Sequence, residues 1–179
     1  MILGLDEILK LVNEIKLVEN LSERELNNPE GAGVDLRIGK VFRLEGKGFL
    51  GVEDRMTPAA ILAAEFRPGE KIEFTLAPGE YVLTETIEKL NMPQNLLAIP
   101  KPRTTLQRSG VMIRLGEVDP GYSGTIHPGI FNASREPFTI EMGVRYVNVT
   151  FFEVKGRASP YRGQWQGGGV DTGGRETQV

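Results

Sequence analysis

Residues 111–131 read VMIRLGEVDPGYSGTIHPGIF and hold two short apolar stretches separated by a turn. Val111–Arg114 and Gly124–Phe131 are typical of strands, and the Asp-Pro-Gly tripeptide at 119–121 is typical of a reverse turn. A strand, a turn and a second strand in so short a segment predict antiparallel β structure.

The same pattern of short strands and turns continues through the middle of the chain. Turns are expected near Pro78, Pro93 and Gly143. Further strands are predicted at Val34–Ile38, Lys71–Leu76, Tyr81–Thr84, Leu96–Ile99, Phe138–Glu141 and Arg145–Val154. Strands at this spacing favour an all-β barrel or sandwich over a βαβ fold.

The two ends of the chain differ from this pattern. Apolar residues recur at spacings of three and four over Leu5–Leu17, which predicts a short amphipathic helix whose stripe packs on the core. Residues 156–179 are rich in glycine and nearly lack aliphatic side chains. We therefore expect one barrel domain, residues 1–155, followed by a flexible tail, residues 156–179. The irregular stretch 46–68 is expected to be a long surface loop.

Length and charge exclude several classes of protein. A chain of 179 residues with 40% apolar and 25% charged residues suits one domain. Its net charge of −3 gives no general electrostatic reason to expect a nucleic-acid polymer or an anionic membrane as partner. No apolar run approaches the ~20 residues of a membrane span. The first residues include Asp6 and Glu7 rather than basic side chains, so we expect a cytoplasmic protein.

Cysteine is absent and His127 is the single histidine. Disulfides, thiolate metal sites and cysteine nucleophiles are excluded, and no protein metal site is predicted. Chemistry must therefore use carboxylates, hydroxyls, Arg or Lys.

Two segments could carry that chemistry. Arg103, Thr104, Thr105 and Arg108 concentrate guanidinium and hydroxyl donors after a predicted strand, which suits phosphate oxygens; the alternative is a solvated loop. Asp119 and Tyr122 flank the Pro-Gly turn and could hold a water and stack on a sugar. Taken alone, that tripeptide is more often only a turn.

The order of four segments resembles the trimeric dUTPase and dCTP deaminase superfamily. These segments are Gly33–Arg37, Arg103–Gly110, Val118–Gly124 and Tyr161–Gly167. The resemblance implies a distorted β barrel of the β-clip type and a homotrimer with active sites at subunit interfaces. It also implies a tail that closes over the nucleotide, and Mg²⁺ bound mainly through the triphosphate.

The resemblance also assigns residues to roles. Arg103, Thr104, Thr105 and Arg108 would bind the triphosphate from a neighbouring subunit. Tyr122 would lie against the deoxyribose, and Asp119 would orient and activate the attacking water. Further substrate contacts are expected from Asn148, Trp165 and Gln166. Asp35 is interpreted either as a substrate contact or as a structural residue paired with Arg37.

Departures from the family pattern decide between activities. In the deaminases, a Glu ten residues beyond the motif Asp carries the proton for attack on cytosine, and this chain has Gly129 there. The zinc route would need Cys and His ligands that the chain lacks. The leading hypothesis is therefore a dUTP diphosphatase. The alternatives are a dCTP deaminase with Glu117 or His127 as proton shuttle, and a deoxynucleotide-binding trimer without catalysis.

Overall fold

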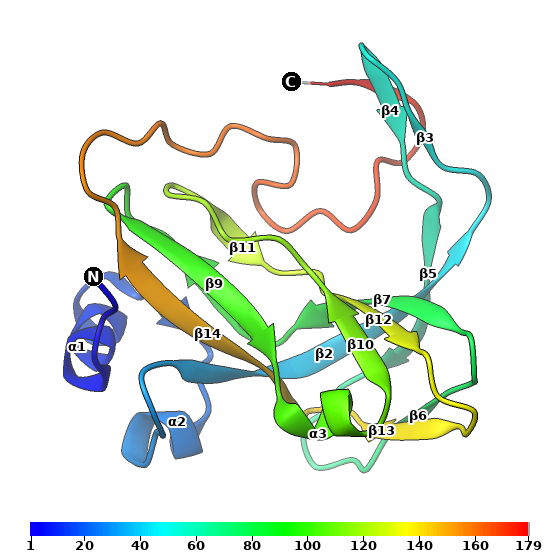
Figure 1. The fold of residues 1–179 in the computed structure, drawn as a ribbon, viewed down its shortest axis with the longest axis horizontal. Helices are drawn as coiled ribbons and strands as arrows, with labels where there is room; N and C mark the ends of the chain where they lie inside the picture. The colour runs from blue at the N-terminus through cyan, green and yellow to red at the C-terminus, as the bar shows by residue number, and fades with distance from the viewer. Residues whose placement is uncertain (179) are drawn as a thin grey trace.

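The computed structural model describes residues 1–178, which form a mainly β structure (Figure 1). The helices are α1 (Leu5–Ile15), α2 (Glu23–Asn27) and α3 (Thr104–Arg108). The strands are β1 (Val18–Glu19), β2 (Val34–Glu45), β3 (Phe49–Leu50), β4 (Asp54–Met56), β5 (Ala59–Glu65), β6 (Glu73–Leu76), β7 (Tyr81–Thr86), β8 (Lys89–Asn91), β9 (Leu96–Pro102), β10 (Val111–Arg114), β11 (Ser123–Thr125), β12 (Gly129–Asn132), β13 (Phe138–Glu141), β14 (Arg145–Glu153) and β15 (Glu176–Thr177).

The main sheet has the strand order β10-β12-β7-β2-β14-β9, and β5 also pairs with β2. The sheet curls so that its edge strands β9 and β10 approach each other (Figure 1). Smaller sheets, β1-β8-β11 and β13-β6, complete the wall. The predicted distorted β barrel with a short N-terminal helix is therefore confirmed.

The stretch Gly124–Phe131 is not one strand, as the sequence predicted, but two. β11 pairs with β8, whereas β12 pairs with β10 and β7. Between them, the carbonyls of Ile126 and Pro128 accept hydrogen bonds from the backbone N–H groups of Thr86 (3.1 Å) and Thr84 (2.9 Å). The chain changes sheets at this point, and Pro128 has no N–H with which to continue a ladder.

The stretch 46–68 is not an irregular loop. β3 and β4 form a hairpin, and β5 pairs with residues 40–45 of β2. We call residues 46–65 the arm. Ala59–Glu65 is rich in alanine and half-exposed, so its sequence carries no strong strand signal, and pairing with β2 stabilises the strand instead.

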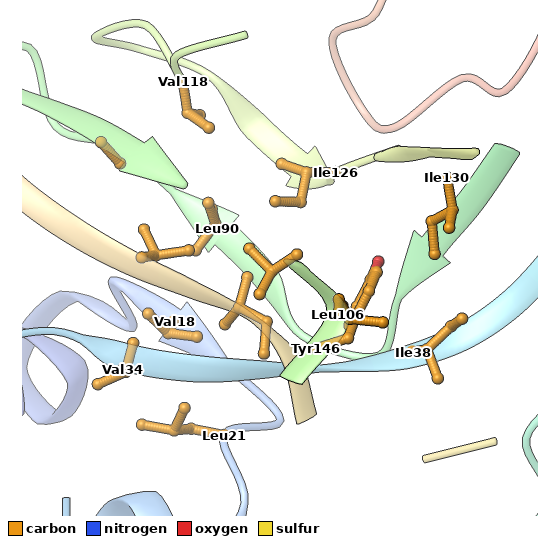
Figure 2. Packing of buried hydrophobic residues seen from close by; sticks show 14 of the residues in the cluster. Val18, Leu21, Val34, Ile38, Leu90, Leu106, Val118, Ile126, Ile130 and Tyr146 are labelled. Carbon is orange, nitrogen blue, oxygen red and sulfur yellow. The ribbon is translucent and has the colours of Figure 1, made fainter. Parts of the chain in front are cut away.

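The core lies inside the barrel, where the side chains shown in Figure 2 meet. Tyr146 and Phe151 of β14 are fully buried there. From α1, Ile8 is buried and Leu11 packs against the core, but Ile15 is 45% exposed, so the predicted apolar stripe is only partly core. None of the helices in residues 1–178 is long and apolar enough to cross a membrane.

A buried ion pair joins β2 to the turn after β7. Glu88 is fully buried and accepts hydrogen bonds from the Arg37 backbone N–H (2.7 Å) and the Arg37 Nε atom (2.6 Å). Burial raises the pKa of Glu88, although Arg37 opposes this shift. Arg37 therefore pairs with Glu88. The interpretation that Asp35 is paired with Arg37 is wrong.

Replacing Arg37 tests this pair. Arg37→Met would leave Glu88 buried without its cation, and we expect a loss of about 3–5 kcal/mol in the free energy of unfolding at pH 7. The buried carboxyl has a raised pKa, so the folded state takes up its proton before the unfolded state does as pH falls. The loss should therefore be smaller at pH 5 than at pH 7, measured by urea unfolding.

Arg67→Met is the matched control for this experiment, because Arg67 forms only an exposed pair with Glu70 at 3.9 Å. We expect it to cost less than about 1 kcal/mol. Equal losses in the two variants would contradict a special role for the Arg37–Glu88 pair.

Candidate functional site

Residues Arg103–Gly110, which we call the phosphate segment, follow β9 directly and contain the short helix α3. The Arg103 backbone N–H donates to the Tyr146 carbonyl at 2.9 Å, which fixes the start of the helix against β14. Leu106 is buried beneath α3, while Thr104, Thr105 and Arg108 are exposed. The hydroxyl and guanidinium groups of this segment therefore face outward from a helix anchored by its apolar side chain.

A network of charged and polar side chains centred on Asp35 positions Arg103. The Asp35 carboxylate forms an ion pair with Arg103, whose Nη1 lies 3.0 Å from Oδ2, and accepts a hydrogen bond from Arg145 Nη1 at 3.1 Å. Its other oxygen accepts from Asn148 Nδ2 at 3.0 Å. Glu25, also buried, accepts from the Asp35 backbone N–H at 3.0 Å. Asp35 thus connects β2 to the phosphate segment, and Asn148 orients Asp35; a direct contact of Asn148 with substrate stays a prediction.

A pocket of about 430 Å³ lies at the other end of the barrel, beside β11. Its lining includes the half-buried Asp119 together with Tyr122, His127 and Tyr81. Arg103 and the rest of the phosphate segment do not line it. In Figure 1, α3 lies at the lower edge of the barrel, and β11 lies near the upper edge of the barrel, below the tail.

Tyr122 forms part of the wall of this pocket. Its hydroxyl donates to the Thr125 carbonyl, and its ring meets the edge of Tyr161 with 5.5 Å between centroids. Burial raises the pKa of Tyr122 to about 12, so the phenol stays protonated at neutral pH. The fixed ring of Tyr122 therefore presents an apolar surface in the same pocket as Asp119, and such a surface suits packing against a sugar.

The tail lies over the pocket of its own chain. Tyr161 N–H donates to the Pro120 carbonyl at 2.7 Å, and Gly167 N–H donates to the Ser123 carbonyl at 2.8 Å. The Gln166 side chain accepts from Ser123 N–H at 3.1 Å and donates to the Gly121 carbonyl at 3.0 Å. Gln166 therefore binds the backbone of the 121–123 turn, while Trp165 lines the pocket.

The arm holds the distal half of the tail. Asp171 accepts from Ala60 N–H at 2.8 Å, and Thr172 and Thr57 exchange hydrogen bonds of 3.0 and 3.1 Å. Glu176 of β15 pairs with Arg55 at 2.8 Å. In Figure 1 the tail runs from the end of β14 across the top of the view to β4. The division into residues 1–155 and a flexible tail stays a prediction, and the structure shows the tail in its docked position.

Two features of the pocket could not be read from the sequence. A β-carbon at position 129 would lie within 2.6 Å of Tyr81 Cζ and overlap the Tyr81 hydroxyl, so the phenol occupies the space above Gly129. Tyr81 is 43% exposed and lines the pocket. In addition, His127 Nε2 lies 3.1 Å from Glu85 Oε2. Both contacts join β7 to the 126–129 segment, and only the folded sheet brings these residues together.

Residues 1–178 contain no group of three His, Cys, Asp or Glu side chains placed to hold a metal ion. The pocket contributes the carboxylates of Asp119 and Glu117, and the exposed hydroxyls of Thr104 and Thr105 lie at the other end of the barrel. Carboxylate and hydroxyl oxygens are donors that Mg²⁺ accepts, and Mg²⁺ bound mainly through phosphates stays a prediction.

Comparison with known proteins identifies the family. The family model described as dCTP deaminase-like matches residues 2–154. The chain belongs to this family. The dCTP deaminase of Pyrococcus furiosus is 34% identical over 159 residues, which cover 88% of each protein. The "dCTP deaminase, dUMP-forming" of Dictyoglomus thermophilum is 31% identical and covers 90% of this chain and 85% of that relative.

A solved structure of a dCTP deaminase agrees with this chain in fold. The 2′-deoxycytidine 5′-triphosphate deaminase of Agrobacterium tumefaciens superposes with a TM-score of 0.65 at 16% identity, covering 84% of this chain and about half (48%) of that chain. The family match and the curated relatives confirm the superfamily resemblance. The names of these relatives agree better with our alternative, dCTP deamination, than with our leading hypothesis of dUTP hydrolysis.

The contact between Gly129 and Tyr81 leads to a stability prediction. Gly129→Ala should displace the Tyr81 ring and cost about 1–3 kcal/mol of folding free energy. That cost should fall by at least half when Tyr81 is already Ala, because the obstructing ring is gone. A double-mutant cycle by urea denaturation measures this coupling.

Gly116→Ala provides the control, since a β-carbon at position 116 meets nothing within 4 Å. It should be neutral or stabilise the fold by about 0.5 kcal/mol. Additive effects of the Gly129 and Tyr81 substitutions would show that the contact is unimportant.

Proposed function

We propose that this protein is a deoxynucleoside triphosphate enzyme that hydrolyses dUTP to dUMP and pyrophosphate. One observation carries the proposal. The position at which the family resemblance puts the deaminase glutamate is Gly129, and the Tyr81 phenol fills the space above it. A glutamate cannot be accommodated there without moving Tyr81, whereas Asp119 and Tyr122 remain together in the pocket.

In the proposed reaction, Asp119 accepts a proton from a water molecule as that water attacks the α-phosphorus. The bond between the α-phosphorus and the bridging oxygen breaks, and pyrophosphate leaves. Arg103 and Arg108 stabilise the negative charge on the phosphates. A Mg²⁺ ion held by the triphosphate would supply neutralisation of phosphate charge. Tyr122 packs against the deoxyribose.

The separation of the two halves supports an oligomeric site. In one chain, α3 and the Asp119 pocket lie at different ends of the barrel. A nucleotide bound beside Tyr122 would need phosphate ligands from another source, and α3 of a second chain is the natural one. We therefore propose a homotrimer whose active sites are shared between subunits.

Deamination of dCTP to dUTP and ammonia is the second candidate. The names of the relatives favour it, and they match along most of this chain. It would require a proton carrier other than a residue at position 129, and His127, in the same pocket, is one candidate. Deamination alone would release ammonia and no pyrophosphate, whereas a reaction that carries dCTP on to dUMP would release both.

Product analysis separates the two candidates. The purified protein is incubated with dUTP or dCTP and Mg²⁺, and pyrophosphate and ammonia are measured in parallel. We expect pyrophosphate from dUTP and no ammonia from dCTP. Ammonia from dCTP without pyrophosphate from dUTP would overturn the proposal in favour of the deaminase, and neither product would favour a binding protein.

Asp119→Asn should lower kcat for dUTP by roughly 10²–10⁴-fold, because the amide cannot accept the proton from water. Nucleotide affinity, measured by calorimetry, should be retained. Asp6→Asn is the matched control, since Asp6 is exposed on α1 and lies outside the pocket. Unchanged turnover in Asp119→Asn would exclude this residue as the base.

Mixing two inactive variants tests the shared site. Asp119→Asn retains a normal α3, and Arg108→Ala retains a normal pocket. If sites form between subunits, subunit exchange should create some sites with both intact halves, and dUTP hydrolysis should partly recover. Mixed trimers that stay inactive after verified exchange would place both halves of each site on one chain.

A further inference from the structure

The pocket beside β11 is walled mostly by apolar side chains and has few polar groups that could read a base. Its apolar members include Leu83, Val118 and Ile126. In such a site, a small number of well-placed hydrogen-bonding groups sets specificity. His127 is one of these groups, because it lines the pocket and only 12% of its side chain is exposed.

The backbone around His127 is fixed on both sides. The carbonyls of its neighbours, Ile126 and Pro128, accept from the backbone N–H groups of β7 at 3.1 and 2.9 Å. The side chain is held as well, since Nε2 lies 3.1 Å from Glu85 Oε2. Glu85 is anchored in turn by Lys40, whose Nζ lies 2.9 Å from Oε1.

Glu85 decides which ring nitrogen of His127 carries the proton. Burial favours the neutral form of Glu85, but hydrogen bonds from His127 and Lys40 outweigh it, and the pKa of Glu85 is lowered. An ionised carboxylate only accepts hydrogen bonds, so Nε2 must be the donor. In a neutral imidazole, Nδ1 then has a free lone pair. The recorded contacts of His127 within residues 1–178 use Nε2 alone.

We propose that Glu85 and His127 form the base-reading group of the pocket, in which His127 Nδ1 accepts the N3–H of uracil. The inference rests on the proposed function, because it assumes that a deoxynucleotide occupies this pocket. Cytosine has no hydrogen at N3, so two acceptors would face each other and both would lose their hydrogen bonds with water.

Tyr81 complements this arrangement. Burial raises the pKa of Tyr81, so its hydroxyl is a protonated donor in the same pocket. Uracil carries a carbonyl oxygen on each side of N3. In this arrangement Nδ1 accepts the N3–H of uracil, and the Tyr81 hydroxyl donates to one of the two carbonyl oxygens beside N3.

Direct binding measures the discrimination without relying on turnover. Calorimetry at pH 8 would compare α,β-imido-dUTP with α,β-imido-dCTP on the full-length protein. We expect the uracil nucleotide to bind roughly tenfold tighter or more, because the cytosine complex leaves buried groups unpaired. His127→Phe should bring the two affinities close together, mainly by weakening the uracil complex.

Two more variants sharpen the test. Glu85→Gln should reduce the discrimination, because an amide can donate to Nε2 as well as accept from it and so allows both tautomers. Glu73→Gln is the matched control, since Glu73 is an exposed carboxylate paired with Lys71 at 2.8 Å outside the pocket. Should His127→Phe fail to fold, His127→Asn removes the imidazole with a smaller polar side chain, and the same loss of discrimination is expected.

The outcomes separate this inference from the proposed function. Discrimination that persists unchanged in a folded His127 variant would overturn the inference and leave hydrolysis intact. Equal binding of both nucleotides by the unsubstituted protein would overturn it as well. Selective binding without dUTP hydrolysis would remove the proposed reaction and support the inference, whereas no binding of either nucleotide would overturn both.

Discussion

The pairing of β14 with β2 on one side and β9 on the other is the constraint on which the rest of the molecule depends. β14 contributes Tyr146 to the core, where its hydroxyl lies 3.0 Å from Thr84 Oγ1 of β7. The same strand accepts the backbone N–H of Arg103 and sends Arg145 to Asp35. The same strand therefore both closes the barrel and positions the phosphate segment, through the consecutive residues Arg145 and Tyr146.

The sequence predicted those elements whose signal is local. Val111–Arg114 and Phe138–Glu141 were predicted with the boundaries that the structure has, because each is a short β-prone run between turns. The arm was missed because its alanine-rich strand exists through pairing with β2. The break between β11 and β12 was missed for a similar reason, since distant backbone groups of β7 impose it.

The candidate site shows the same division. The turn that carries Asp119 and Tyr122 could be recognised because the residues are near in sequence, and the structure places them in one pocket with Trp165. The contacts of Tyr81 with Gly129 and of Glu85 with His127 join residues more than 40 positions apart. Nothing in either segment alone indicates its partner, so these contacts could be found only in the folded sheet.

The tail brings Trp165, the single tryptophan of the chain, to the pocket whose wall contains the single histidine. The indole fluorescence of this protein therefore arises from Trp165 alone, and its imidazole proton resonances arise from His127 alone. Both residues line the same pocket. Binding of a ligand in this pocket, or a movement of the tail, would therefore change two independent spectroscopic signals, with no label and no engineered residue. The molecule therefore carries its own reporters at the pocket in which we propose that a nucleotide binds.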